Sequence, residues 1–195
     1  MLSASSINDN TLVRDALHAF YTEHNLGEDG GINKNWATFK VGRFYIPFPN
    51  TSSRKKALLW HDIHHLTTGY NGYWEGEISI CAWEVASNCR GYYAAWFLDL
   101  GGMALGAWLY PRKMFNAFIR GRRTHNLYSG ILTADEAKTM TLGEVRHLLK
   151  LNKHTSEPAT GNEIAAFLGW TSLSWLMFGW PFLVLAICLY QKLGL

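Results

Sequence analysis

Residues 60–65 read Trp-His-Asp-Ile-His-His. On an α-helix, His61 and His65 lie one turn apart and Asp62 lies three residues before His65, so the three side chains share one face. Two imidazoles and a carboxylate that converge in this way are typical ligands of a divalent metal ion. The stretch therefore predicts a helix over residues 54–67 that carries part of a metal site.

A second helix is predicted from residue 74 or 75 to about residue 90, after the turn-forming sequence Gly-Tyr-Asn-Gly at 69–72. A helix hairpin through this turn can place Glu77 opposite the histidines, with Glu75 and Glu84 as neighbouring competitors. The lack of thiolate ligands indicates an open site, with zinc as the first choice of ion and iron, manganese or cobalt as rivals. We predict the metal ligands to be His61, Asp62, His65 and Glu77.

Two more side chains near the motif are candidates for proton transfer. His64 points about 100° away from His65 around the helix, so it is expected either to support the site or simply to be buried. Glu84 shares a helix face with Glu77, although it could equally cap the helix or pair with Arg90. We predict His64 and Glu84 as the catalytic residues that deliver or accept a proton.

The rest of the pattern is that of an all-α protein. Residues 11–25 predict an amphipathic helix capped by the preceding Asp9-Asn10 pair. The sequences Thr-Ala-Asp-Glu at 133–136 and Thr-Leu-Gly-Glu at 141–144 fit capping boxes that begin short surface helices. Residues 39–49 are expected to be extended because their prolines exclude a helix. We predict one helical metal-binding domain over residues 1–160.

An apolar segment follows this domain. Residues 164–190 are 27 residues without Asp, Glu, Lys, Arg or His, which is longer than the roughly 20 needed to span a bilayer. We predict a C-terminal membrane segment there rather than a buried core helix, and Pro181 allows either one kinked span or a shallow hairpin. Residues 92–110 are a weaker candidate. Because Asp99 lies within them, we expect a buried or membrane-skimming helix.

Charge is distributed unevenly along the chain. The net charge is only +3, so no nucleic-acid partner is expected, but residues 111–154 hold nine Lys and Arg against three Asp and Glu. This basic segment favours the cytoplasmic face of the inner membrane and anionic lipid headgroups. Within it, Arg120, Arg122 and Arg123 are expected to form a lipid-facing or solvated cluster. The three cysteines form no metal-binding pair and are expected to be reduced, and no secretory signal is expected.

The motif resembles that of a known family. His-Asp-x-x-His, eleven residues and Glu77 match the motif of the ubiquinone (coenzyme Q) biosynthesis family, member four of that pathway, and the likeness covers roughly residues 44–128. Because the chain is shorter than the eukaryotic members, we expect it to belong to a short bacterial branch. The resemblance implies an all-α fold, a zinc site, a place on the membrane beside other quinone-biosynthesis enzymes, and a prenylated aromatic substrate. It implies (oxidative) decarboxylation at ring carbon 1 of a 4-hydroxy-polyprenylbenzoate.

Three other functions fit parts of the pattern. His-x-x-His-His at 61–65 is also typical of membrane hydroxylases and desaturases, which need further histidine boxes. A phosphohydrolase with a His-Asp pair would need an upstream histidine and a distant aspartate, for which His24 and Asp99 are available. A non-catalytic, lipid-binding scaffold for quinone-biosynthesis enzymes would use the metal only structurally.

Overall fold

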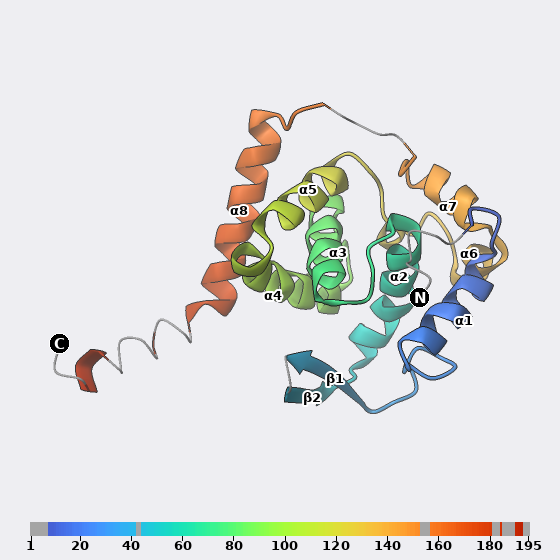
Figure 1. Cartoon of the computed structure of the whole chain (residues 1–195), viewed down its shortest axis with the longest axis horizontal. Coiled ribbons are helices and arrows are strands. Elements are labelled where there is room, and N and C mark those ends of the chain that lie inside the picture. Colours follow the sequence, from blue (N-terminus) through green and yellow to red (C-terminus); the bar gives the residue numbers. More distant parts are fainter. Residues whose placement is uncertain (1–7, 42–43, 153–156, 181–183, 185–189, 193–195) are drawn as a thin grey trace.

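The structure is a computed structural model that describes residues 8–41, 44–152, 157–180, 184 and 190–192 (Figure 1). It is mostly helical, which confirms the all-α prediction in this coarse form. In chain order the elements are α1 (Val13–Glu23), β1 (Trp36–Val41), β2 (Phe44–Pro49), α2 (Ser52–Thr68), α3 (Trp74–Ser87), α4 (Tyr93–Leu109), α5 (Pro111–Arg122), the 3-10 helix η2 (Leu127–Ser129), α6 (Ala134–Thr139), α7 (Leu142–Leu148) and α8 (Gly161–Phe178).

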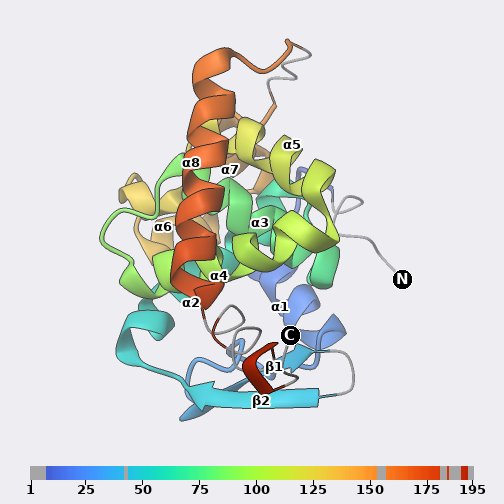
Figure 2. The same cartoon turned by 90° about the vertical axis from the view of Figure 1, so that its left-hand side faces the viewer.

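Helix α3 is the centre of the molecule, with α2, α4 and α5 around it (Figures 1 and 2). Every side chain from Ile78 to Ala86 is buried. Helix α5 approaches closely at Gly121, where a Cβ atom would lie only 2.5 Å from the Trp83 carbonyl oxygen. The acidic side chains of α3 therefore lie on a helix that is held firmly by its neighbours.

The C-terminal end of α2 is fixed by two arginines. The helix stops at Gly69, whose φ of 80° is in the left-handed region. Arg120 donates to the Thr68 carbonyl oxygen at 2.8 Å, and Arg146 donates to the Thr67 carbonyl oxygen at 3.0 Å. Both cations thus satisfy carbonyl groups that have no partner within the helix.

The predicted arginine cluster is therefore wrong for two of its three members. Arg120 binds the end of α2, and Arg123 binds the Glu163 carboxylate at 2.7 and 2.8 Å. Arg122 alone of the three is exposed. Local charge in the sequence did not reveal that distant partners, a helix-end carbonyl and a carboxylate, bind two of these side chains.

The start of α1 also differs from the prediction. Asp9 and Asn10 do not cap it, and Leu12, the residue before the helix, makes no side-chain cap hydrogen bond. Instead, the Val13 amide donates to the Met140 carbonyl oxygen at 2.9 Å. A contact with a distant segment replaces the local cap.

Other local signals are present as predicted. Both capping boxes form, at the starts of α6 and α7, and a third that we did not predict begins α8 with Thr160 and Glu163. The extended stretch is present too, although it belongs to an antiparallel pair in which Pro47 lies opposite Thr38 and Pro49 opposite Trp36. A two-stranded sheet has only edge strands, which tolerate proline.

Helices α4 and α8 contain the two apolar runs. Among the described residues, no helix is both long enough and apolar enough to cross a membrane. Helix α4 buries Asp99 on its inner side, so the acidic side chain faces protein. The predicted interruption at Pro181 lies outside the described residues, as does much of the second half of segment 164–190.

Candidate metal centre

Three of the four predicted ligands meet in space. The His61 and His65 Nε2 atoms are 3.1 Å apart. A Glu77 carboxylate oxygen lies 3.5 Å from His61 Nε2, and the other lies 3.5 Å from His65 Nε2. Helix α2 supplies both imidazoles one turn apart, and α3 supplies the carboxylate after the turn between them.

Hydrogen bonds on the far side of each imidazole orient both rings. His65 Nδ1 lies 2.9 Å from the Tyr70 carbonyl oxygen, to which it can only donate. His61 Nδ1 lies 3.2 and 3.3 Å from the two Glu84 oxygens, and donation to this carboxylate is again the favourable arrangement. With a proton on each Nδ1, both Nε2 lone pairs of the neutral rings point toward Glu77.

These distances fit a tetrahedral ion. Metal–nitrogen and metal–oxygen bonds of about 2.0–2.2 Å at tetrahedral angles place neighbouring ligand atoms about 3.3 Å apart. The three separations of 3.1, 3.5 and 3.5 Å bracket that value. Two neutral imidazoles and a carboxylate are also the donor set of open zinc sites, with iron and manganese as alternatives. The residues present therefore fit a divalent ion.

Asp62, the fourth predicted ligand, is not part of this group of three. It is buried, and the Tyr21 hydroxyl donates to one of its oxygens at 3.0 Å. Burial raises the pKa of the Asp62 carboxyl to about 6, although His61 and His65 nearby act to lower it. The structure thus places Asp62 beside the ligands, with one oxygen held by α1.

The two predicted catalytic residues, His64 and Glu84, lie behind the ligands. Both are completely buried, with His64 Nδ1 2.6 Å from a Glu84 oxygen. His64 Nε2 accepts from the Leu127 amide at 2.9 Å, so its Nδ1 carries the proton and donates to Glu84. The Tyr128 hydroxyl also donates to Glu84, at 3.2 Å. Neither His64 nor Glu84 reaches the surface from which a substrate would approach.

Asp99 completes this buried network. It forms a group with His61 and Glu84, and it accepts from the Cys89 thiol at 3.3 Å. Burial raises the pKa of the Asp99 carboxyl well above its usual range, and the Glu84 carboxylate raises it further. A neutral Asp99 can therefore share its proton with Glu84. Because the donors already satisfy Glu84, this second group is better suited to orienting His61 than to binding an ion.

The charges of the site favour a cation. Burial acts to raise the pKa of both Glu77 and Glu84. The neighbouring imidazoles outweigh burial and hold both pKa values well below their usual range, so both carboxyls are ionised. Burial lowers the pKa of His61, yet the same two carboxylates raise it well above its ordinary value. Positive charge between these groups is thus stabilised, whether a proton or a metal ion carries it.

The site opens on the side of Glu77. The Glu77 side chain is 39% exposed and that of His61 22%, whereas that of His65 is 1% exposed. Gly76 allows the start of α3 to press against the preceding turn, because a Cβ atom there would lie 1.8 Å from the Asn71 carbonyl oxygen. This close packing holds Glu77 beside the histidines and leaves one side of the group accessible.

The competitors of Glu77 have other partners. Glu75 forms an ion pair with Lys113, and Glu84 lies on the Nδ1 side of His61 rather than in the alternative pair with Arg90. His24 packs against Phe20 and Tyr73 and belongs to neither ligand group.

Sequence reasoning missed Tyr21, Tyr128 and Asp99 as parts of the site. An acidic residue within an apolar run is a recognised sign of a functional position, and Asp99 had that sign. Nothing near Tyr21 or Tyr128 in the sequence marks them, because their carboxylate partners lie 41 and 44 residues away.

No protein-family model, curated protein or solved structure matches the chain. The resemblance to the ubiquinone biosynthesis family therefore stays a prediction, and the functional argument depends on the residues and their geometry.

We expect His65→Ala and Glu77→Ala to lose the bound divalent ion, because each removes one of three converging ligands. Loss of a ligand should cost more affinity than the roughly 10- to 100-fold that follows from loss of a supporting hydrogen bond. Metal content of the purified proteins by mass spectrometry measures this. His125→Ala is the control, since His125 is exposed and belongs to neither ligand group. Full metal content in His65→Ala would contradict the assignment.

Asp62 should make the metal-free protein less stable as the pH rises. The pKa of about 6 in the folded state exceeds the ordinary 3.8, so folding favours the neutral carboxyl. The contribution of the neutral Asp62 carboxyl to the free energy of unfolding is complete below about pH 4. This contribution is lost as the pH rises from there through 6, and the total loss is about 2–3 kcal/mol. Urea unfolding of chelator-treated wild type and Asp62→Asn at several pH values isolates this effect. Parallel pH profiles for the two proteins would contradict it.

Proposed function

We propose that this chain is a metal-dependent carbon–carbon lyase of ubiquinone biosynthesis. Its substrate would be a 4-hydroxy-polyprenylbenzoate-type precursor, from which it removes the carboxyl group at ring carbon 1, with or without oxidation at that carbon. The observation that carries the proposal is the convergence of the His61 and His65 Nε2 atoms on Glu77, at separations that fit a divalent ion.

The open side of the site supports a catalytic rather than a structural ion. A closed structural site surrounds its ion with four protein ligands, whereas three converging residues with an exposed edge leave a position for substrate. When bound, a divalent ion there supplies a Lewis acid that holds the carboxylate or phenolate oxygen and stabilises the negative charge that develops as the carbon–carbon bond breaks.

The residues behind the ligands would orient them. Glu84 holds His61 through Nδ1, and the Tyr70 carbonyl holds His65 in the same way. Since His64 and Glu84 are completely buried, any proton that they deliver or accept would pass through His61. Their predicted catalytic role is thus proposed here as an indirect one.

A prenylated substrate requires access to lipid. We place the chain on the cytoplasmic face of the inner membrane, where basic residues of segment 111–154 would meet anionic headgroups and other quinone-biosynthesis enzymes would be neighbours. The apolar segment 164–190 would contribute the membrane contact. We propose no nucleic-acid partner, because the net charge of the chain is only +3.

The alternatives receive less support. A hydroxylase would need more histidines near the site, and none of the other histidines in the described part of the chain joins either ligand group. In a phosphohydrolase, Asp99 would have to bind the same ion as the His61 Nε2 atom. Asp99 instead lies beside Glu84, which is on the Nδ1 side of His61. The non-catalytic scaffold would need neither an exposed edge nor a free ligand position.

A strain that lacks this chain should accumulate a carboxylated prenyl-phenol precursor and lose quinone. Glu77→Gln should reproduce this phenotype in a folded protein, because it keeps the shape of the side chain but removes the charge that binds the ion. Lipid extracts analysed by mass spectrometry provide the measurement.

Glu75→Gln is the matched control, since Glu75 lies on the same helix but pairs with Lys113. It should restore quinone synthesis. Normal quinone in the deletion strain, with no redundant decarboxylase present, would contradict the proposed reaction and leave the scaffold and hydroxylase as candidates.

A further inference from the structure

Helix α8 is apolar around its whole circumference but packs on the protein with one side only. No residue from Ile164 to Phe178 is charged. Trp170 stacks on Trp96 of α4, and Phe167 packs against Phe118 of α5. A helix that is apolar all round is normally buried all round, so the outer side of α8 needs a covering layer.

The outer side of α4 continues this apolar surface. Trp108 of α4 and Trp175 of α8 stack with ring centroids 5.2 Å apart, and Phe97 of α4 contacts Phe178 of α8. Trp108 nevertheless remains 74% exposed, as does Leu176 on α8. We call this surface the α4–α8 face; its main exposed members are Phe97, Trp108, Leu109, Leu168, Trp175 and Leu176.

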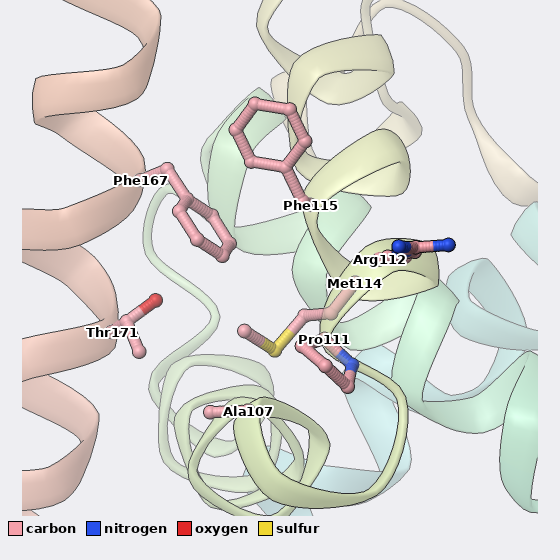
Figure 3. A pocket seen from close by; sticks show the side chains of 7 residues that line it. All are labelled: Ala107, Pro111, Arg112, Met114, Phe115, Phe167 and Thr171. Atoms are coloured by element: carbon pink, nitrogen blue, oxygen red, sulfur yellow. The ribbon is translucent and has the colours of Figure 1, made fainter.

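A cavity between the helices adds to the apolar area. It has a volume of about 360 Å³ and lies between α8 and the junction of α4 with α5 (Figure 3). The rings of Phe115 and Phe167 and the thioether of Met114 line it, and Arg112 is part of its lining as well (Figure 3). An apolar cavity of this kind suits a hydrocarbon chain better than water.

The chemistry of the α4–α8 face favours lipid over a protein partner. Protein interfaces carry about one hydrogen bond per 100–200 Å², yet the outer side of α8 offers no charged or amide side chain after Glu163. Indole rings such as those of Trp108 and Trp175 concentrate at the boundary between hydrocarbon and water. Arg112 follows closely after Trp108 and Leu109, is exposed, and has no hydrogen bond or ion pair with a described residue, so it is available to a lipid phosphate.

We propose that the α4–α8 face docks on a phospholipid bilayer, with α8 lying along the membrane surface and Arg112 at the headgroups. The proposal rests on the proposed function only for the location of the chain. It assigns the membrane contact to two helices of the folded domain, and so differs from a membrane anchor formed by segment 164–190 alone.

Flotation of the purified full chain with phosphatidylcholine vesicles, with and without phosphatidylglycerol, tests this docking. Leu176→Glu and, separately, Trp108→Glu should each lower the partition coefficient at least about tenfold, because each moves a charge into the contact. Arg112→Gln should lower binding about fivefold on vesicles that contain phosphatidylglycerol and leave phosphatidylcholine binding unchanged.

Ile131→Glu is the matched control. Ile131 is exposed and apolar and lies in the turn shortly before α6, a helix on the opposite side of the molecule from α8 (Figure 1). This variant should bind vesicles as the wild type does. Circular dichroism and metal content of every variant should match the wild type, which separates loss of docking from loss of the fold or of the metal centre.

Three results would overturn the proposal. The first is a folded wild type that binds neither kind of vesicle. The second is unchanged binding of Trp108→Glu, which would assign the contact to segment 164–190 alone. The third is a lipid-free dimer that Leu176→Glu converts to a monomer without any vesicle binding, which would identify a second copy of the chain as the covering layer. If the purified wild type binds vesicles but contains no metal, the docking proposal is supported and the proposed function is contradicted.

Discussion

The proposed metal centre depends on two hydrogen bonds that lie outside it. The Tyr70 carbonyl and the Glu84 carboxylate each hold the Nδ1 side of one imidazole, and together they turn both Nε2 lone pairs toward Glu77. Without these bonds, nothing would fix which nitrogen of each ring faces Glu77. With them, the two Nε2 atoms lie 3.1 Å apart, close enough to share a proton or to bind one metal ion.

The buried network around Glu84 explains how the fold tolerates so much polarity in its centre. A buried carboxylate is costly unless hydrogen bonds satisfy it. Glu84 receives bonds from His61, His64 and Tyr128, and its neighbour Asp99 is neutral because burial and the Glu84 charge raise its pKa. The same bonds that stabilise this carboxylate orient a ligand, so the stability of α3 and the geometry of the site are linked.

Local spacing predicted most of the helices and the meeting of three of the four predicted ligands, whereas long-range contacts decided the rest. His61, His65 and Glu77 follow from one helical turn and a glycine-rich hairpin, and capping boxes at α6 and α7 follow from adjacent residues. Asp62 lies outside the ligand group, and Tyr21 of the distant helix α1 binds it. The position of Asp62 in the motif could not reveal this contact. The Asp9 cap failed for the same reason, since strand-like contacts with residues 140–141 replace it.

Anomalous X-ray diffraction from crystals of the metal-loaded protein tests the central claim most directly. We predict one anomalous peak within about 2.0–2.2 Å of His61 Nε2, His65 Nε2 and a Glu77 oxygen, with at least one further position facing solvent. A peak on the Nδ1 side of His61, between Glu84 and Asp99, would contradict this account, as would the absence of any peak beside the two histidines.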